Sequence, residues 1–123
     1  MIGYVTLGTN DFERAKTFYD AVLGELGAKR TQTFENMQLY GTGRGPMVAI
    51  CRPYDKRKAS AGNGTMVALS ADSHALIDKV YAKAMANGAT DEGAPGDRGG
   101  NFYGAYFRDP DGNKLNGFFL QHG

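Results

Sequence analysis

The chain has 123 residues, of which 41% are hydrophobic and 22% are charged, and its formal net charge is +1. These values are typical of one globular domain and exclude a disordered or fibrous chain. The small net charge argues against nucleic acid or an anionic membrane as a partner, and no run approaches the roughly 20 apolar residues of a membrane-spanning helix. The single cysteine, Cys51, and a charged rather than apolar N-terminal stretch predict a cytoplasmic protein.

The first half of the chain has the pattern of a strand, a helix and a three-stranded meander. Residues 2–8 alternate between two faces, as a strand does. Asn10 and Glu13 have the spacing of a capping box, and apolar residues then recur at helical spacing until Gly27, a residue that favours a left-handed helix end. Three short β-prone segments follow, at residues 28–34, 37–40 and 46–53.

Residues 54–64 are polar, contain glycine and have no apolar periodicity, so they are predicted to form a surface linker. The linker contains the basic run from Lys56 to Lys58. Asp55 stands beside this run and only Tyr54 supplies an aromatic ring, so we interpret it as solvated rather than as an anion-binding or nucleic-acid-binding segment.

The second half repeats the pattern of the first. A strand is predicted at residues 65–70, and a helix from about Ser73 to the Asn87–Gly88 pair. Short strands are predicted at residues 90–92, 102–108 and 114–120, with a glycine-rich loop at 96–101 and a tight turn at 109–113.

The two halves match closely enough to indicate an internal duplication. The strand around Ala68 stands 62 residues after the strand around Thr6, and Gly88 stands 61 residues after Gly27. We therefore predict one α+β domain, residues 1–123, built from two tandem βαβββ modules. Module one covers about 1–53, the linker 54–64, and module two about 65–123.

Three stretches of the chain resemble a known family. They are residues 4–24, residues 64–69 and residues 107–115, the last of which contains the turn Asp109-Pro110-Asp111-Gly112-Asn113. In these stretches the chain resembles the glyoxalase/bleomycin-resistance/dioxygenase superfamily, also called the vicinal oxygen chelate (VOC) superfamily. The resemblance implies a cup-shaped mixed sheet with the helices outside, a small-molecule site inside the cup, and a homodimer.

The resemblance also indicates where metal ligands would lie. In metal-dependent members, ligands come from the first and last strands of each module. Carried onto this chain, these positions fall on Tyr4, on Ile50 or Cys51, on Met66 and on Asn116. None of them is the His or Glu that such members use to hold a divalent cation. We therefore expect no metal and no other cofactor.

Three of the same positions are candidates for ligand binding. Tyr4 and Asn116 could offer hydrogen bonds to a small molecule, and Met66 could offer an adaptable apolar wall. The alternative is that all three fill the core of a site that has lost its function.

Three further residues are candidates near the expected cup. Phe102 and Tyr103 stand beside the glycine-rich loop, which could form a flap, although alternating aromatic residues on a strand also serve ordinary sheet packing. Arg52 could pair with an acidic ligand group, or could be a solvated residue at the end of its strand.

The nucleophilic and imidazole side chains give no catalytic pattern. Cys51 would need a neighbouring base, and the sequence shows no such arrangement, so it is interpreted as a buried strand residue. His74 and His122 are both expected on the surface, outside the cup. No catalytic residue is therefore assigned.

Two main functions stay open at this stage. The first is a protein that binds a small, partly aromatic or acidic organic molecule in the cup without a metal. The second is a glyoxalase-like lyase, isomerase or dioxygenase that uses an unusual ligand set or acid–base chemistry by Tyr4. A dimer whose cup is plugged by side chains is a third possibility.

Overall fold

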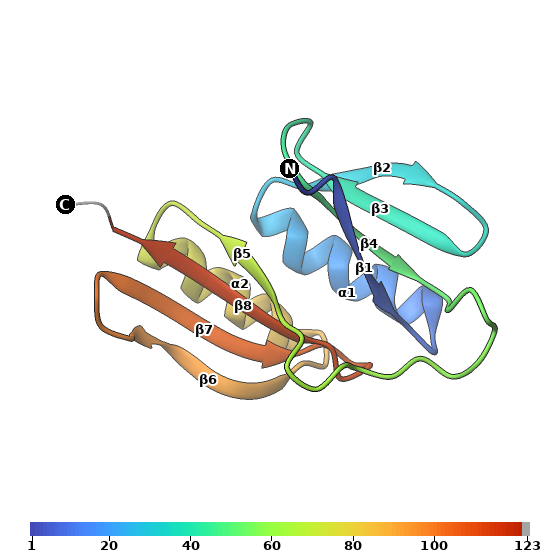
Figure 1. Ribbon diagram of the computed structural model, residues 1–123. Helices are drawn as coiled ribbons and strands as arrows, with labels where there is room; N and C mark the ends of the chain where they lie inside the picture. The colour runs from blue at the N-terminus through green and yellow to red at the C-terminus, as the bar shows by residue number, and fades with distance from the viewer. Residues whose placement is uncertain (122–123) are drawn as a thin grey trace.

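The computed structural model describes residues 1–121 and shows the expected order of elements (Figure 1). Each module contains four strands and one helix. Module one comprises β1 (Tyr4–Gly8), α1 (Phe12–Glu25), β2 (Lys29–Thr33), β3 (Met37–Gly41) and β4 (Met47–Cys51). Module two comprises β5 (Val67–Ser70), α2 (His74–Ala86), β6 (Thr90–Asp97), β7 (Phe102–Arg108) and β8 (Lys114–Leu120).

The strands form two separate four-stranded mixed sheets with the same topology. Sheet A has the order β1-β4-β3-β2, and sheet B has the order β5-β8-β7-β6. In each sheet the first and last strands of the module pair in parallel, and the other pairs are antiparallel. The α+β class and the two-module architecture are thus confirmed.

Both helices lie on the same side of the molecule, behind the sheets in the view of Figure 1. We call this side of each sheet the helix face and the opposite side the open face. Strand alternation sends Leu7 and Leu69 into the core on the helix face, whereas Thr6 and Ala68 are exposed on the open face. The core joins both modules, since it contains Phe18 of α1 together with residues of α2, β7 and β8. Within residues 1–121, neither helix is long and apolar enough to cross a membrane.

The helix ends follow from local sequence, with one correction. Helix α1 begins one residue later than predicted, because Asp11 rather than Asn10 is the N-cap and its carboxylate accepts the amide of Arg14. At the other end Gly27 has a φ of 83°, and Gly88 after α2 has a φ of 98°. In both modules the amide of the alanine after the glycine bonds a helix carbonyl at 3.0 Å, which is the Schellman motif.

The glycine-rich loop is much shorter than the sequence suggested. Strand β6 extends to Asp97 instead of ending at residue 92, and it pairs with β7 along its length despite two register shifts. The amide of Arg98 donates to the carbonyl of Phe102 at 2.7 Å, and the amide of Gly99 donates to the Asp97 carboxylate at 2.7 Å. The predicted flap is therefore a tight hairpin turn.

The turn between β7 and β8 ties module two to module one. Asp109 is buried, and the hydroxyl of Tyr19 on α1 donates to its Oδ2 at 2.6 Å. The side-chain amide of Asn113 donates to the same oxygen and to the carbonyl of Gly8, both at 2.9 Å. Burial raises the pKa of Tyr19 well above its usual value, and the negative charge of Asp109 raises it further.

The first prediction concerns this buried contact. Tyr19→Phe removes a hydrogen bond to an ionised, buried carboxylate, so we expect a loss of about 1.5–3 kcal/mol in the free energy of unfolding. Urea unfolding followed by circular dichroism measures it. The raised pKa of Tyr19 adds a second readout. The free energy of unfolding should be unaffected by this group below about pH 10 and should fall as the pH rises above that value. The fall should be less steep in Tyr19→Phe, which lacks the titrating hydroxyl.

The matched control is Tyr81→Phe. The hydroxyl of Tyr81 also donates to a carboxylate, that of Asp91 at 2.9 Å, but this bond is exposed to solvent. We expect this change to cost less than about 1 kcal/mol. Equal losses for the two variants would show that the Tyr19 contact does not hold the modules together.

Candidate functional site

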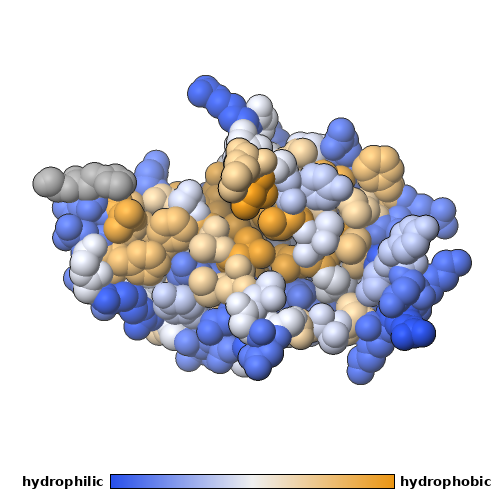
Figure 2. Space-filling model, in the orientation of Figure 1, coloured by the Kyte–Doolittle hydropathy of each residue, from blue (hydrophilic) through white to orange (hydrophobic). Residues whose placement is uncertain are grey.

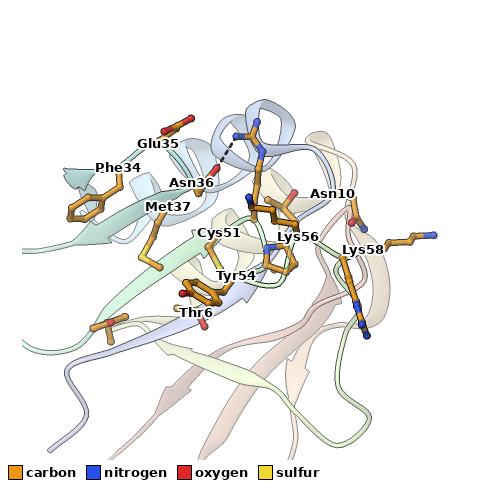
Figure 3. A pocket seen from close by; sticks show the side chains of 16 residues that line it. Thr6, Asn10, Phe34, Glu35, Asn36, Met37, Cys51, Tyr54, Lys56 and Lys58 are labelled. Carbon is orange, nitrogen blue, oxygen red and sulfur yellow. Dashed lines mark hydrogen bonds between the residues drawn. The ribbon is translucent and has the colours of Figure 1, made fainter.

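A large open cavity lies on the open face of sheet A. Its volume is about 1430 Å³, and it is bounded by β1, the end of β4, the β2–β3 turn and the linker (Figure 3). Phe34 and Met37 lie at one end of the cavity, and Lys56 and Lys58 lie at the other. The cavity therefore has an apolar end and a basic end.

The apolar part is built by strand alternation and register. Tyr4 and Thr6 point from β1 to the open face, and Met37 of β3 stands directly opposite Cys51 of β4. Tyr4 is 54% exposed and Phe34 is 58% exposed, which is unusual for large apolar rings. Such exposure in a concave region is typical of a binding surface.

Cys51 contributes a neutral thiol to this surface. It is half-buried, and burial raises the pKa of its thiol above the usual value, so the thiolate is disfavoured. His74 cannot serve as its base, because it lies on α2 and stacks on Tyr103. His122, the other histidine, lies outside the described residues. The geometry supports the interpretation that Cys51 is not a nucleophile.

The linker lies on the surface as expected, and it is anchored beside the cavity at Ala59, its one buried residue. Asn10 makes two hydrogen bonds to the backbone of Ala59: its amide donates to the carbonyl at 3.1 Å, and its Oδ1 accepts the N–H at 2.7 Å. Ala59 is only 8% exposed, and its Cβ lies 3.0 Å from the point where a Cβ on Gly8 would stand. The end of β1 thus needs a glycine so that the linker can dock there.

The basic run begins in a turn that lies between the end of β4 and the anchored residue Ala59. The amide of Lys56 donates to the carbonyl of Pro53 at 3.0 Å, and the amide of Arg57 donates to the Asp55 carboxylate at 2.9 Å. Lys56 has a φ of 64°, a left-handed conformation that costs free energy in a residue other than glycine. The position of this turn beside the cavity was not predicted from the sequence, because a polar linker has no periodicity that would show where it docks.

Arg52 is held at the edge of the same cavity. Its amide donates to the carbonyl of Asn36 at 2.9 Å, and its Nη1 donates to the side-chain oxygen of Asn36 at 3.3 Å. Its guanidinium lies 5.0 Å from the centre of the Phe12 ring. Arg52 is therefore exposed but positioned, and it keeps most of its five N–H donors for another partner.

The corresponding surface of module two is closed. Asn116 on β8 is 1% exposed, and its side-chain amide donates to the carbonyls of Ala105 at 2.9 Å and Gly117 at 3.1 Å. Phe102 stacks on Phe118 with the ring centres 5.4 Å apart. The side-chain amide of Asn116 is thus satisfied by the backbone of sheet B, and the two Phe rings pack on each other.

A second, smaller cavity of about 520 Å³ is lined by residues of both modules. It lies along the unpaired edges of β1 and β5 and is lined by apolar side chains such as Val5, Leu23 and Met66. The six candidate residues are thus not brought together. Tyr4 and Arg52 line the large cavity, Met66 lines the smaller one, and Asn116 is enclosed in sheet B.

Phe102 and Tyr103 lie on opposite faces of β7. The hydroxyl of Tyr103 donates to Asp78 of α2 at 2.7 Å, and its ring stacks on His74 at 4.0 Å. Tyr103 therefore belongs to the helix face. The hydrogen bond to Asp78 raises the pKa of Tyr103, so the phenolate form that could act as a general base is disfavoured.

The register of the sheets revises one of the positions aligned with metal ligands. Asn116 pairs with Ala68, and the same register in module one pairs Thr6 with Ala49. The counterpart of Asn116 is therefore Ala49, not Ile50 or Cys51, and Ile50 is buried in the core on the helix face. Within residues 1–121 there is no group of three or more His, Cys, Asp or Glu side chains that could hold a metal ion.

The second prediction tests the anchor of the linker. Asn10→Ala removes both side-chain bonds to Ala59, so we expect trypsin to cleave the linker after Lys56, Arg57 or Lys58 several-fold faster than in the unmodified protein. Mass spectrometry of the fragments identifies the cleavage sites. Asn87→Ala is the control, because it removes a side-chain bond of similar length, 2.8 Å to Lys83, at the end of α2. Unchanged cleavage in Asn10→Ala would mean that the linker does not depend on this anchor.

Comparison with known proteins identifies the family. The family model "Glyoxalase/Bleomycin resistance protein/Dioxygenase superfamily" matches residues 1–116. A glyoxalase/bleomycin resistance protein from Albidiferax ferrireducens T118 is 36% identical with a TM-score of 0.92, and the alignment covers 98% of this chain and 99% of that chain. The search of curated proteins found no match.

More distant structures share the fold. A glyoxalase/bleomycin resistance protein/dioxygenase family enzyme from Burkholderia phytofirmans PsJN is 20% identical with a TM-score of 0.79, over 97% of this chain and 98% of that chain. Lactoylglutathione lyase from Agrobacterium tumefaciens is 20% identical with a TM-score of 0.71, over 97% and 92%. The duplicated βαβββ fold and the family match agree, and the chain belongs to the glyoxalase/bleomycin resistance protein/dioxygenase superfamily.

Proposed function

We propose that this protein binds a small organic molecule in the large cavity on the open face of sheet A, and that it does so without a divalent metal ion. The observation that carries the proposal is the cavity itself, about 1430 Å³ in volume, with exposed rings of Tyr4, Phe34 and Tyr54 around it. Apolar walls with a few polar groups at the margin are the usual composition of small-molecule sites.

The chemistry of the ligand positions supports binding without a metal. Tyr4 offers a phenol, Ala49 a methyl group, Met66 a thioether, and Asn116 a carboxamide whose N–H groups are already bonded. A divalent cation of the kind that metal-dependent relatives hold needs imidazole nitrogens or carboxylate oxygens. The thiol of Cys51 does not stand at the position equivalent to Asn116, which the register assigns to Ala49. The unpaired thiol also suits the reducing cytoplasm, where we place the protein.

We further propose that two copies form a homodimer through their open faces. Figure 2 shows that hydrophobic residues gather in the centre of this side of the molecule. Large apolar side chains on the open face are well exposed, with Tyr4 at 54%, Met66 at 42% and Leu120, at the end of β8, at 41%. A contiguous apolar surface of this kind is stabilised by covering it with a partner. In such a dimer Met66 and Phe102 would line the interface or the ligand site.

The third prediction tests the cavity with an uncharged fluorescent dye, N-phenyl-naphthylamine. Thr6 is exposed on β1 and lines the cavity, so a bulky side chain there should fill the floor without disturbing the core. We expect Thr6→Trp to weaken dye binding about tenfold, as measured by fluorescence titration.

Thr17→Trp is the control, because Thr17 is exposed on the outer surface of α1, away from the cavity. It should leave dye affinity unchanged. Equal affinity of the dye for Thr6→Trp and for the unmodified protein would overturn the assignment of this cavity as the ligand site.

The fourth prediction concerns metal content and assembly. Native mass spectrometry of the purified protein should show the mass of two chains and no stoichiometric divalent ion, because the ligand positions lack suitable donors. Elemental analysis provides the independent measurement.

The rival function is a metal-dependent or acid–base lyase, isomerase or dioxygenase. About one Ni, Zn, Fe or Mn ion per chain, or turnover of methylglyoxal with glutathione when such ions are added, would contradict binding without a metal. A monomeric mass at micromolar concentration would contradict the dimer.

A further inference from the structure

Positively charged residues outnumber negatively charged ones around the large cavity. Four basic residues line it, Arg52 from the end of β4 and Lys56, Arg57 and Lys58 from the linker. Among residues 1–121, Glu35 is the one acidic residue that lines it, and it stands on the β2–β3 turn. The whole chain carries a net charge of only +1, so this excess of positive charge is local to the cavity.

The basic side chains have no acidic partner of their own. In the part of the chain that the structure describes, no ion pair involves any of these four residues. The carboxylate of Asp55, which is the nearest in sequence, accepts the backbone amide of Arg57 instead. Three of these cations are consecutive residues of the linker, where like charges repel one another, and an anion bound beside them would relieve that repulsion.

The structure fixes the backbone of this basic segment at the cavity. The segment lies between the end of β4 and Ala59. The backbone N–H and C=O of Ala59 are both hydrogen-bonded to the side chain of Asn10. Lys56 adopts a left-handed conformation within the turn. Strained positions of this kind are concentrated at ligand sites, where the surrounding structure maintains them.

The positive charge of the linker is also separated from the apolar surface, and the acidic Glu35 stands beside Phe34. Figure 3 shows Lys56 and Lys58 at one end of the cavity, and Phe34 and Met37 at the other, with Tyr54 and Cys51 between them. A molecule that satisfies both ends has an anionic group attached to a flat apolar body. A cationic ligand would meet like charge here.

We propose that the ligand of this protein is an organic anion with a planar apolar body, and that Lys56, Arg57 and Lys58 of the linker recognise its anionic group. This inference rests on the proposed function and names the class of ligand for the same cavity. Arg57 offers a planar fork for a carboxylate or phosphate, and the ammonium groups of Lys56 and Lys58 add positive charge on either side of it in the chain.

The experiment compares two dyes that share an anilinonaphthalene body: anilinonaphthalene sulfonate, which is an anion, and N-phenyl-naphthylamine, which is neutral. The unmodified protein should bind the anion more tightly, and the difference should shrink as ionic strength rises. In the variant Lys56→Gln/Arg57→Gln/Lys58→Gln, affinity for the anion should fall about fivefold or more, while affinity for the neutral dye stays the same.

The matched control removes three positive charges elsewhere, in Lys29→Gln/Lys79→Gln/Lys83→Gln. These exposed residues do not line the cavity, so this variant should keep its preference for the anion. Competition by naphthoate and by naphthyl phosphate then shows whether a carboxylate or a phosphate is preferred.

The outcomes separate this inference from the proposed function. If both dyes bind equally, if the linker variant changes neither affinity, or if the two triple variants lose anion affinity equally, recognition of an anion by the linker is wrong. The cavity still stands as the site in that case, provided that Thr6→Trp weakens both dyes. If Thr6→Trp changes neither, the proposed function fails as well.

Discussion

The hydrogen bond from Tyr19 to Asp109 is the contact on which the arrangement of this molecule depends. It joins the helix of module one to the last turn of module two inside the core. A buried carboxylate is costly unless its oxygens are satisfied, and Asp109 accepts from the amides of Asp111 and Asn113 as well. Asn113 in turn holds the carbonyl of Gly8, at the point where the linker docks. The cavity in module one is thus held in shape by residues of module two.

Most of the fold could be predicted from sequence because its signals are local. Strand alternation, the start of α2 near Ser73 and the glycines after each helix depend on a few neighbouring residues, and they predicted the two-module fold correctly. The extension of β6 was missed because its pairing partner, rather than its own glycine-containing sequence, makes it a strand. The role of Asp109 was also missed: the sequence shows that a turn forms there, but not that Tyr19, far away in the chain, donates to it.

The candidate site was predictable only in part, since it depends on register and on long-range contacts. Alternation implies that Phe102 and Tyr103 face opposite ways, but only the pairing of β7 shows that Tyr103 faces α2. Tyr4 and Arg52 do lie at one cavity, as their strand positions allowed. The linker is exposed as predicted, but its anchor at Ala59 was not predicted, because it depends on two hydrogen bonds from Asn10 that no pattern of hydrophobicity can reveal.

The two modules share a topology but differ in what they place on their open faces. At equivalent positions, module one has the small methyl group of Ala49, whereas module two has Asn116, which bonds carbonyls within its own sheet. A Cβ on Gly104 would stand 2.8 Å from the Phe102 ring, so the aromatic pair of module two packs directly over its sheet. Sheet B is therefore filled by its own side chains, while sheet A leaves space that the linker borders. Duplication supplied two similar surfaces, and the larger cavity lies in module one because the linker and the β2–β3 turn border it there, whereas the aromatic side chains of module two pack on their own sheet.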